Sequence, residues 1–239
     1  MKKIVVLTGA GISAESGMAT FRGAGGLWNN YPVEQVATPE GYRRNPGLVI
    51  RFYNELRRQL QDIQPNGAHL MLAELERRCG GNMTVVTQNV DDLHERAGSR
   101  HVIHLHGELL KVTSSRDPNN PACIRTLKPG EYEVRMGDRA ADGSQLRPFI
   151  VWFGEPVPLI EQAIEEASRA DIFIIIGTSL AVYPAAGLLQ YVPAGAEVYL
   201  IDPEEVAVPS GRPVRFIRTG ATEGMKELMN LLTAQKICS

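Results

Sequence analysis

The stretch that most constrains the fold lies near the N-terminus, where a nearly continuous apolar run over residues 2–8 leads into Gly9, Gly11 and Ala14. This G-x-G-x-x-A spacing is typical of a tight strand-to-helix turn, in which glycine permits a positive φ and backbone N–H groups approach a pyrophosphate. The same spacing also occurs in turns without a ligand, and no acidic residue ends a second strand about 20 residues later, as an ordinary dinucleotide-binding unit requires. The pattern therefore predicts a strand buried on both faces of a parallel sheet, followed by a turn that either holds phosphates or binds nothing.

Length and composition limit the class of protein. The 239 residues fit one large α/β domain, or a large domain with a small lobe, and 44% of them are hydrophobic. With 25 basic and 27 acidic residues the formal charge is -2, which argues against an extended nucleic-acid surface. No apolar run approaches the roughly 18 residues of a membrane span, and three widely spaced cysteines are typical of a reducing compartment. We therefore expect a cytoplasmic protein that contacts neither membrane nor nucleic acid.

Hydrophobic periodicity places strands and helices in alternating order. Strands are expected at residues 2–8, 83–87, 101–105, 149–153, 171–176, 197–201 and 214–217. Helices are expected at residues 46–63, after the cap Asn45, and at 66–79, 159–168 and 222–234. This order predicts an α/β fold with a doubly wound parallel sheet. Two stretches interrupt the sheet: a helical insertion at 29–81, and a polar stretch at 107–147 that is expected to be irregular after a β-like run at 109–113.

Polar residues follow several predicted strands at the point where each strand ends. Gln88-Asn89-Val90-Asp91 follows one strand, Gly177-Thr178-Ser179 a second and Asp202 a third. Ligands of open α/β sheets bind at this edge, so these residues are candidate phosphate, ribose or amide contacts. Asn89 and Asp91 also have a plainer interpretation, because Asn and Asp are common turn residues.

Three of the five histidines, His101, His104 and His106, lie together along one predicted strand, and the spacing of two residues would place His104 and His106 on one face. They could hold a metal ion, or they could pack at the strand edge without a ligand. His106 differs because glycine follows it and it ends its strand, where a general base near pH 7 is useful. A glycine-rich stretch at 20–28 is predicted to be a mobile loop that closes over a ligand, the alternative being an Ω-loop packed on its own aromatic residues.

Taken in order, these segments resemble the sirtuin family of NAD-dependent protein lysine deacylases over almost the whole chain. The matching segments are Gly9-Ala10-Gly11-Ile12-Ser13, Gly17 with Thr20-Phe21-Arg22, Gln88-Asn89-Val90-Asp91, His106-Gly107-Glu108, Val151-Trp152-Phe153-Gly154-Glu155, and Gly177-Thr178-Ser179-Leu180 with Val182-Tyr183-Pro184. Within the family, Ala37-Thr38-Pro39 and Phe52-Tyr53 make the chain most similar to the branch that contains bacterial and mitochondrial desuccinylases. The resemblance implies a Rossmann-type domain from residues 1–28, 82–106 and 148–239, and a small lobe from the insertions 29–81 and 107–147.

The resemblance also implies which residues form the site. NAD would lie across the carboxyl edge of the sheet, with His106 as the catalytic residue. The residues expected to contact NAD are Gly9, Ala10, Gly11, Ile12, Glu15, Thr20, Phe21, Arg22, Trp28, Gln88, Asn89, Val90, Asp91, Gly177, Thr178, Ser179, Asp202 and Ala221. The acyl-lysine protein or peptide would contact Tyr53, Leu56, Val151, Phe153, Gly154, Glu155, Leu180 and Val182.

The implied reaction begins when the acyl-lysine carbonyl oxygen attacks C1′ of the nicotinamide ribose and displaces nicotinamide. His106 then acts as general base on the ribose hydroxyls, and the products are free lysine and O-acyl-ADP-ribose. The peptide would bind as an extended strand between residues 153–155 and 180–183. Two other functions stay open: an ADP-ribosyltransferase, and a sensor that binds NAD or ADP-ribose without turnover. A dehydrogenase fits least, because it needs a hydride-transfer site.

The sequence departs from the sirtuin pattern at two places. Relatives usually carry four zinc cysteines in the small lobe, but residues 107–147 hold only Cys123, and Ser114 stands where the first ligand is expected. One thiol does not make a tetrahedral site, so we expect no zinc. Desuccinylases place an arginine three residues after the tyrosine to bind the distal carboxylate, but here that position is Leu56, followed by Arg57. Leu56 either lines the acyl pocket or belongs to the apolar stripe of its helix. Either way, we expect acetyl or longer uncharged acyl groups to be removed at least as well as succinyl.

Overall fold

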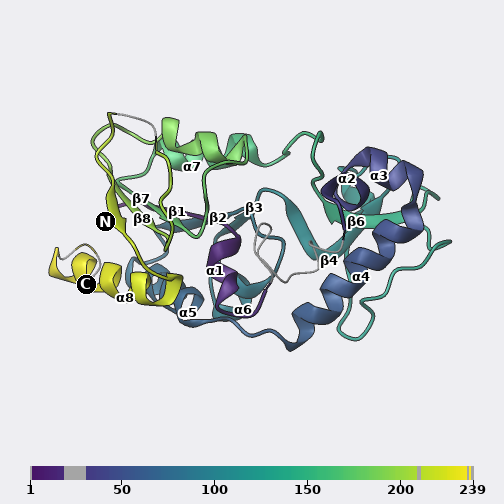
Figure 1. The fold of residues 1–239 in the computed structure, drawn as a ribbon, viewed down its shortest axis with the longest axis horizontal. Helices are drawn as coiled ribbons and strands as arrows, with labels where there is room; N and C mark the ends of the chain where they lie inside the picture. Colours follow the sequence, from purple (N-terminus) through teal and green to yellow (C-terminus); the bar gives the residue numbers. More distant parts are fainter. Residues whose placement is uncertain (1, 19–30, 209–210, 236, 238–239) are drawn as a thin grey trace.

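The computed structural model describes residues 2–18, 31–208, 211–235 and 237, which form two sheets (Figure 1). The larger sheet is parallel, in the order β3-β2-β1-β7-β8-β9, and the smaller is antiparallel, in the order β5-β4-β6. The larger sheet consists of β1 (Ile4–Thr8), β2 (Met83–Thr87), β3 (Val102–His104), β7 (Ile172–Ile176), β8 (Glu197–Ile201) and β9 (Arg215–Ile217). The smaller sheet consists of β4 (Gly107–Ser114), β5 (Arg125–Thr126) and β6 (Leu146–Ile150). The predicted α/β fold is confirmed.

Helices cover both faces of the larger sheet. One face carries α5 (Gly67–Arg78) and α8 (Ala221–Ala234), and the other carries α7 (Ile160–Ser168) and the 3-10 helix Ala185–Gln190 (Figure 1). The central strand β1 serves both layers. Its residues Ile4 and Val6 pack into the core beside α5 and α8, whereas Val5 and Leu7 pack into the core beside α7. The burial on both faces that the apolar run predicted is therefore confirmed.

Residues 31–81, the described part of the helical insertion, contain four helices. The two short ones, α2 (Val33–Val36) and α3 (Pro39–Arg44), precede α4 (Pro46–Asp62) and then α5. The predicted start of α4 is confirmed, because Asn45 Oδ1 accepts a hydrogen bond from the Leu48 N–H at 3.0 Å and Pro46 occupies the first turn. Asn66 caps α5 in the same way, by accepting from the Ala68 N–H at 2.9 Å.

The strand expected at 149–153 is wrong in both position and sheet. The structure places β6 at Leu146–Ile150 and pairs it with β4 in the smaller sheet, with Gly107 opposite Ile150. Beyond this strand, the Val151 N–H donates to His106 O and the Phe153 N–H donates to Ala37 O. The apolar run correctly indicated a buried strand, but apolarity does not specify which sheet a strand joins.

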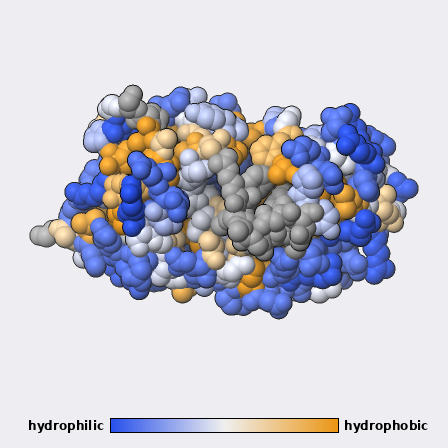
Figure 2. Space-filling model, in the orientation of Figure 1, coloured by the Kyte–Doolittle hydropathy of each residue, from blue (hydrophilic) through white to orange (hydrophobic). Residues whose placement is uncertain are grey.

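The stretch between β4 and β6 is mostly irregular, as predicted, with β5 and the 3-10 helix Pro121–Cys123 as its regular elements. It packs against one end of α4, where Ile50 joins Val112, Cys123 and Leu146 in a small core. None of the helices within the described ranges is long and apolar enough to cross a membrane. The face drawn in Figure 2 is mostly hydrophilic, with smaller hydrophobic patches.

Candidate active site

The carboxyl ends of three neighbouring strands bring the predicted site residues together. Thr8 of β1 is in register with Thr87 of β2 on one side and with Ile176 of β7 on the other. The residues that follow these strands therefore meet at one edge of the sheet. Gln88 shows this directly, because its Nε2 donates a hydrogen bond to Thr178 Oγ1 at 3.0 Å.

The glycine turn after β1, which leads into α1 (Ala10–Ala14), packs tightly on the turn after β7. A Cβ atom on Gly9 would lie 2.7 Å from Gly177 O, and one on Gly11 would lie 2.6 Å from Gly177 Cα. The positive φ that the glycine spacing permits is not used at Gly9, which is extended at φ -128°, whereas Gly177 in the facing turn has φ 62°. The N–H groups of Gly9 and Gly11 donate to Ile176 O and Gly177 O, so these two amides do not face a pyrophosphate. The glycines are needed for close backbone approach.

Asn89 and Asp91 are held by a serine of α1. Ser13 Oγ donates to Asp91 Oδ2 and accepts from Asn89 Nδ2, both at 3.1 Å. Asn89 Nδ2 also donates to Gly9 O at 3.1 Å, so both amide hydrogens are used and Oδ1 is the group left for a ligand. Burial raises the pKa of Asp91 above its usual range. Ser13 belonged to the recognised glycine segment, but its bridging role was not predicted, because residues 78 positions apart carry no local signal.

His106 lies at the same edge, immediately before β4. Its Nδ1 is 3.0 Å from Gln88 O. A carbonyl oxygen only accepts hydrogen bonds, so Nδ1 carries the hydrogen and Nε2 of the neutral ring keeps its lone pair. Burial lowers the pKa of His106 below its usual value. Both effects favour a neutral imidazole at pH 7 with Nε2 as its basic atom.

The other expected cofactor residues lie along this edge or next to it. Glu15, at the end of α1, accepts a hydrogen bond on Oε1 from the Thr222 N–H at 3.1 Å, one residue after the buried Ala221 that begins α8. Asp202 follows β8, and burial raises its pKa. Val90 is partly buried and packs against the apolar core that contains Phe52 of α4 and Leu109 of β4. The expected contacts Thr20, Phe21, Arg22 and Trp28 lie outside the described residues.

Tyr53 and Trp152 form a buried polar pair. Tyr53 Oη accepts the indole N–H of Trp152 at 3.1 Å. Burial raises the pKa of Tyr53 well above its usual range, with smaller opposing contributions from Trp152 and nearby arginines. Arg147 lies with its guanidinium 3.4 Å from the centre of the Trp152 ring and forms a bidentate ion pair with Glu155. Glu155 also accepts from the Trp152 N–H at 2.9 Å, so its carboxylate is committed within the protein.

Leu56 and Arg57 differ from what a carboxylate-binding site requires. Leu56 is 4% exposed and packs with Phe52 and Leu60, so it belongs to the apolar stripe of α4. Arg57 is fully buried, and burial lowers its pKa to about 10. Its Nε donates to Leu109 O at 2.7 Å and its Nη1 donates to Asn54 Oδ1 at 2.8 Å. Arg57 is therefore anchored to the core of the small lobe.

The expected peptide-binding segments lie on two loops. Phe153 is 45% exposed, and Gly154 has φ 90°, in the loop after β6. Leu180, with φ 52°, and the half-buried Val182 follow β7. Both loops start next to site residues. The first follows Val151, whose N–H donates to His106 O, and the second begins at Gly177.

The described residues contain no group of three or more His, Cys, Asp or Glu side chains placed to hold a metal ion. His101 bonds instead to Glu76, with Nδ1 to Oε1 at 2.6 Å, and His104 bonds to Glu95. The histidine metal site raised as one alternative is therefore not formed by these side chains. Where the first zinc cysteine was expected, the buried Ser114 donates to Asp142 Oδ2 at 2.6 Å and accepts from two backbone N–H groups.

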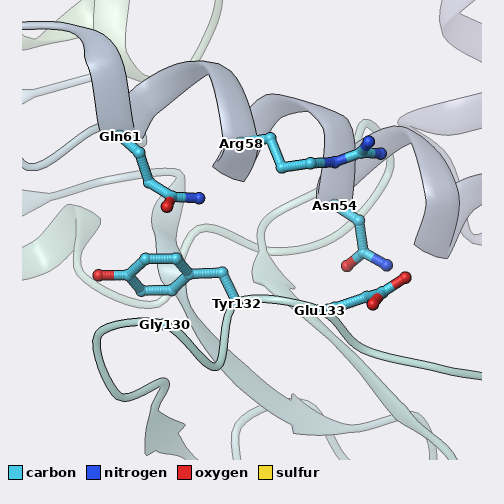
Figure 3. Close-up of a pocket in the computed structure, with 6 residues that line it drawn as sticks. All are labelled: Asn54, Arg58, Gln61, Gly130, Tyr132 and Glu133. Carbon is cyan, nitrogen blue, oxygen red and sulfur yellow. The ribbon is translucent and has the colours of Figure 1, made fainter.

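A separate pocket of about 230 Å³ lies between α4 and the loop at residues 130–133 (Figure 3). Gln61 and Asn54 project from α4 toward Tyr132 and Glu133, and Arg58 and Gly130 complete the lining. Asn54 lies 3 residues from Arg57 and bonds to it. The sequence offered no signal for this pocket, and none of the predicted site residues lines it.

Known proteins share both the sequence and the fold. The sequence matches the Sir2 family over residues 9–184. It is 67% identical over 232 residues to a protein of Bacteroides thetaiotaomicron named "NAD-dependent protein deacylase", which covers 97% of this chain and 98% of that protein. A protein of the same name from Helicobacter pylori is 50% identical over 229 residues, 96% of each chain.

Among solved structures, a complex of a Sir2 homolog with NAD has a TM-score of 0.84 at 40% identity, over 98% of this chain and 91% of that chain. A complex of Sir2 with a p53 peptide and NAD+ has a TM-score of 0.78 at 32% identity, over 97% of this chain and 93% of that chain.

Proposed function

This chain belongs to the Sir2 family and is an NAD-dependent protein deacylase, and from this premise we propose that His106 is the general base of its reaction. The hydrogen bond from His106 Nδ1 to Gln88 O carries the proposal, because it fixes the neutral ring with its lone pair on Nε2. A neutral imidazole with a lowered pKa accepts a proton from a ribose hydroxyl at neutral pH. The general-base role thus follows from one backbone contact and from burial.

NAD is the cosubstrate, and we propose that it lies across the edge formed by β1, β2 and β7. NAD supplies the electrophilic ribose carbon, from which nicotinamide leaves. On the protein side, Asn89 offers Oδ1 to an amide such as the carboxamide of nicotinamide. Asp91, whose pKa burial raises, is held by Ser13 and the Leu93 N–H. The ordered hydrogen bonds of Asn89 and Asp91 support a preformed pocket.

We also propose that the acyl-lysine substrate lies between the loop at Phe153–Glu155 and the loop at Leu180–Tyr183. A peptide is present in one similar structure, a complex of Sir2 with a p53 peptide and NAD+. The position of both loops beside His106 and Gly177 supports the same arrangement here. Residues 1–28, 82–106 and 148–239 would then form the NAD-binding domain. Residues 29–81 and 107–147 would form the small lobe, to which β6 contributes across the boundary.

For acyl choice, we propose that the chain belongs to the desuccinylase-like branch but removes acetyl or longer uncharged acyl groups at least as well as succinyl. Three contacts support this: Leu56 lies in the core, Arg57 is tied to Leu109 O and Asn54, and the Tyr53 hydroxyl is bonded to Trp152. Loss of a charge-assisted hydrogen bond to the distal carboxylate removes about 1.5–3 kcal/mol of preference, or roughly tenfold to a hundredfold in specificity. We expect kcat/KM for an acetyl-lysine peptide to equal or exceed that for the matched succinyl peptide.

The small lobe, we propose, needs no zinc. Ser114, Asp142 and Ser144 join the end of β4 to the loop before β6 by hydrogen bonds of 2.6 to 2.9 Å. These contacts connect the end of β4 to the loop before β6, as a metal bound between the two segments would. Metal analysis of the purified protein is expected to find far less than one zinc per chain.

One experiment tests the reaction and its acyl preference together. Nicotinamide release from NAD is measured with and without acetyl- and succinyl-lysine versions of one peptide, and the peptide mass is recorded. We expect nicotinamide release to require the acyl peptide, which loses its acyl group, and His106→Ala to lower the rate of acyl loss from the peptide at least 100-fold. Transfer of ADP-ribose to the peptide, full activity of His106→Ala, or a tenfold preference for succinyl would each contradict one part of the proposal.

A further inference from the structure

A second histidine holds the same segment as His106, but in a different protonation state. His104, at the end of β3, is 8% exposed and stands opposite Thr87 in the sheet. Its Nδ1 lies 3.2 Å from Asn89 O and its Nε2 lies 2.7 Å from Glu95 Oε1. A carbonyl and an ionised carboxylate both only accept hydrogen bonds, so both ring nitrogens carry hydrogen. His104 is therefore an imidazolium, whereas His106 is neutral.

The groups around His104 agree with this charge. Burial opposes it, but the hydrogen bond and the charge of Glu95 on α6 (Leu93–Ala97), the charge of Glu108 on β4 and the Asn89 carbonyl outweigh burial, so the pKa of His104 is raised. Asp91 also lies within electrostatic range of it. The remaining titratable neighbour, His94 on α6, is fully buried, and burial lowers its pKa well below the usual value. His104 is thus surrounded by acidic groups and one neutral ring.

We propose that His104 is a positioning residue for deacylation: its imidazolium, held by Glu95, fixes the Asn89 carbonyl and thereby the segment that presents Asn89 and Asp91 to NAD. The inference rests on the proposed role of that segment in NAD binding. The Asn89 N–H donates to Thr87 Oγ1 at 3.0 Å, so the Asn89 residue is anchored at both its N–H and its carbonyl. Its side chain then points at Ser13 and Gly9 O in one orientation.

Loss of the His104 proton breaks this arrangement. A neutral imidazole has one N–H for two acceptors, and the charge-assisted bond to Glu95 is the stronger of the two. The remaining hydrogen then stays on Nε2, and the lone pair of Nδ1 faces the lone pairs of Asn89 O. The Asn89 segment loses an anchor as pH rises through the pKa of His104. The result is a fall of kcat on the alkaline side of the pH profile.

The first experiment compares His104→Leu with the matched control His101→Leu. His101 forms the same kind of bond at the other end of β3, from its Nδ1 to Glu76 Oε1 at 2.6 Å, but it does not contact Asn89. We expect His104→Leu to lower kcat about 10-fold to 100-fold, because small misplacements in an active site cost about that much, and to weaken inhibition by nicotinamide. His101→Leu is expected to change neither by more than about twofold. His104→Gln, which retains one donor for Asn89 O, is expected to recover part of the loss.

The second experiment records the pH profile of Glu95→Gln. Glu95 is 42% exposed on its side chain, so the isosteric amide is tolerated. Because a glutamine amide donates to Nε2, neutral His104 keeps its hydrogen on Nδ1 and retains the Asn89 bond at high pH. We therefore expect the alkaline fall of kcat seen in the wild type to disappear in Glu95→Gln. This readout does not require the leucine variants to fold.

Two results would overturn the inference: equal effects of His104→Leu and His101→Leu on kcat and nicotinamide inhibition, or identical alkaline profiles of the wild type and Glu95→Gln. The proposed function fails separately. Full activity of His106→Ala would refute the general-base assignment, whatever the behaviour of His104. If His106→Ala is inactive while His104→Leu matches its control, the inference about His104 alone is wrong.

Discussion

The Ser114 hydroxyl is the centre of the contacts that stabilise the small lobe without zinc, and its removal tests them. Ser114 is fully buried at the end of β4. Its Oγ donates to Asp142 Oδ2 at 2.6 Å and accepts from the N–H groups of Arg116 and Asp117, both at 3.0 Å. Ser114→Ala removes these three bonds at once, together with the 2.9 Å contact between the Ser114 and Ser144 hydroxyls. At about 1 kcal/mol for each bond, the free energy of unfolding should fall by about 3 kcal/mol.

The expected change is measurable by thermal and chemical unfolding. For a chain of this size, about 1 kcal/mol corresponds to roughly 2–4 °C in Tm, so Ser114→Ala should melt about 6–12 °C lower. Ser168→Ala is the control, because Ser168 makes an exposed bond to Glu165 O within α7 and should change stability by at most about 0.5 kcal/mol. Both proteins and the wild type are measured with and without a strong chelator.

This assay separates the contribution of the Ser114 hydroxyl from that of a bound metal. If Ser114→Ala melts within about 1 °C of Ser168→Ala, the hydroxyl does not hold the small lobe. If the chelator lowers the wild-type Tm by several degrees, or one zinc per chain is found, a metal holds it instead. The expected result is a chelator-independent Tm in all three proteins.

Three further predictions concern single side chains. Because burial lowers the pKa of His106, kcat should stay constant as the pH is lowered from 7 to 6.5. It should fall only at lower pH, where Nε2 becomes protonated, and a midpoint of this fall above pH 6.5 would contradict the prediction. Tyr53→Phe leaves the buried Trp152 indole N–H without its acceptor and should cost about 1–3 kcal/mol in urea unfolding, whereas an unchanged midpoint would show that the bond contributes nothing. Burial lowers the pKa of His69 to about 4; the unfolded chain binds more protons between pH 6.5 and 4, so stability should fall by up to about 3 kcal/mol as pH drops through this range. His69→Gln should flatten that dependence, and a variant as acid-sensitive as the wild type would refute the assignment to His69.

Local sequence signals were sufficient for most elements of the larger sheet. The apolar run at Ile4–Thr8 and the Asn45-Pro46 helix start each act through residues that are near neighbours in the chain. Their positions follow from backbone sterics, from capping and from burial on two faces. The same locality explains why polar residues at strand ends identified the edge at which Gln88 and Thr178 meet.

The sequence alone did not determine how distant segments pair. The run near Phe149 looked like another strand of the main sheet, yet its partner is β4, because pairing depends on which edges are left open and not on apolarity. The glycine turn looked suited to positive φ, but Gly9 is needed because Gly177 approaches within contact distance. Each case depends on a neighbour more than 30 residues away in the chain.

Protonation at the site is likewise a property of the tertiary structure. His104 and His106 are two residues apart and chemically identical in the sequence, and spacing suggested that they share a face. In the fold, each donates from Nδ1 to one of two consecutive carbonyls, of Asn89 and Gln88, but only His104 also meets a carboxylate, that of Glu95. The sequence thus determined which residues reach the edge of the sheet. Their three-dimensional neighbours determined which histidine is charged and which is basic, because hydrogen bonds and burial set each pKa.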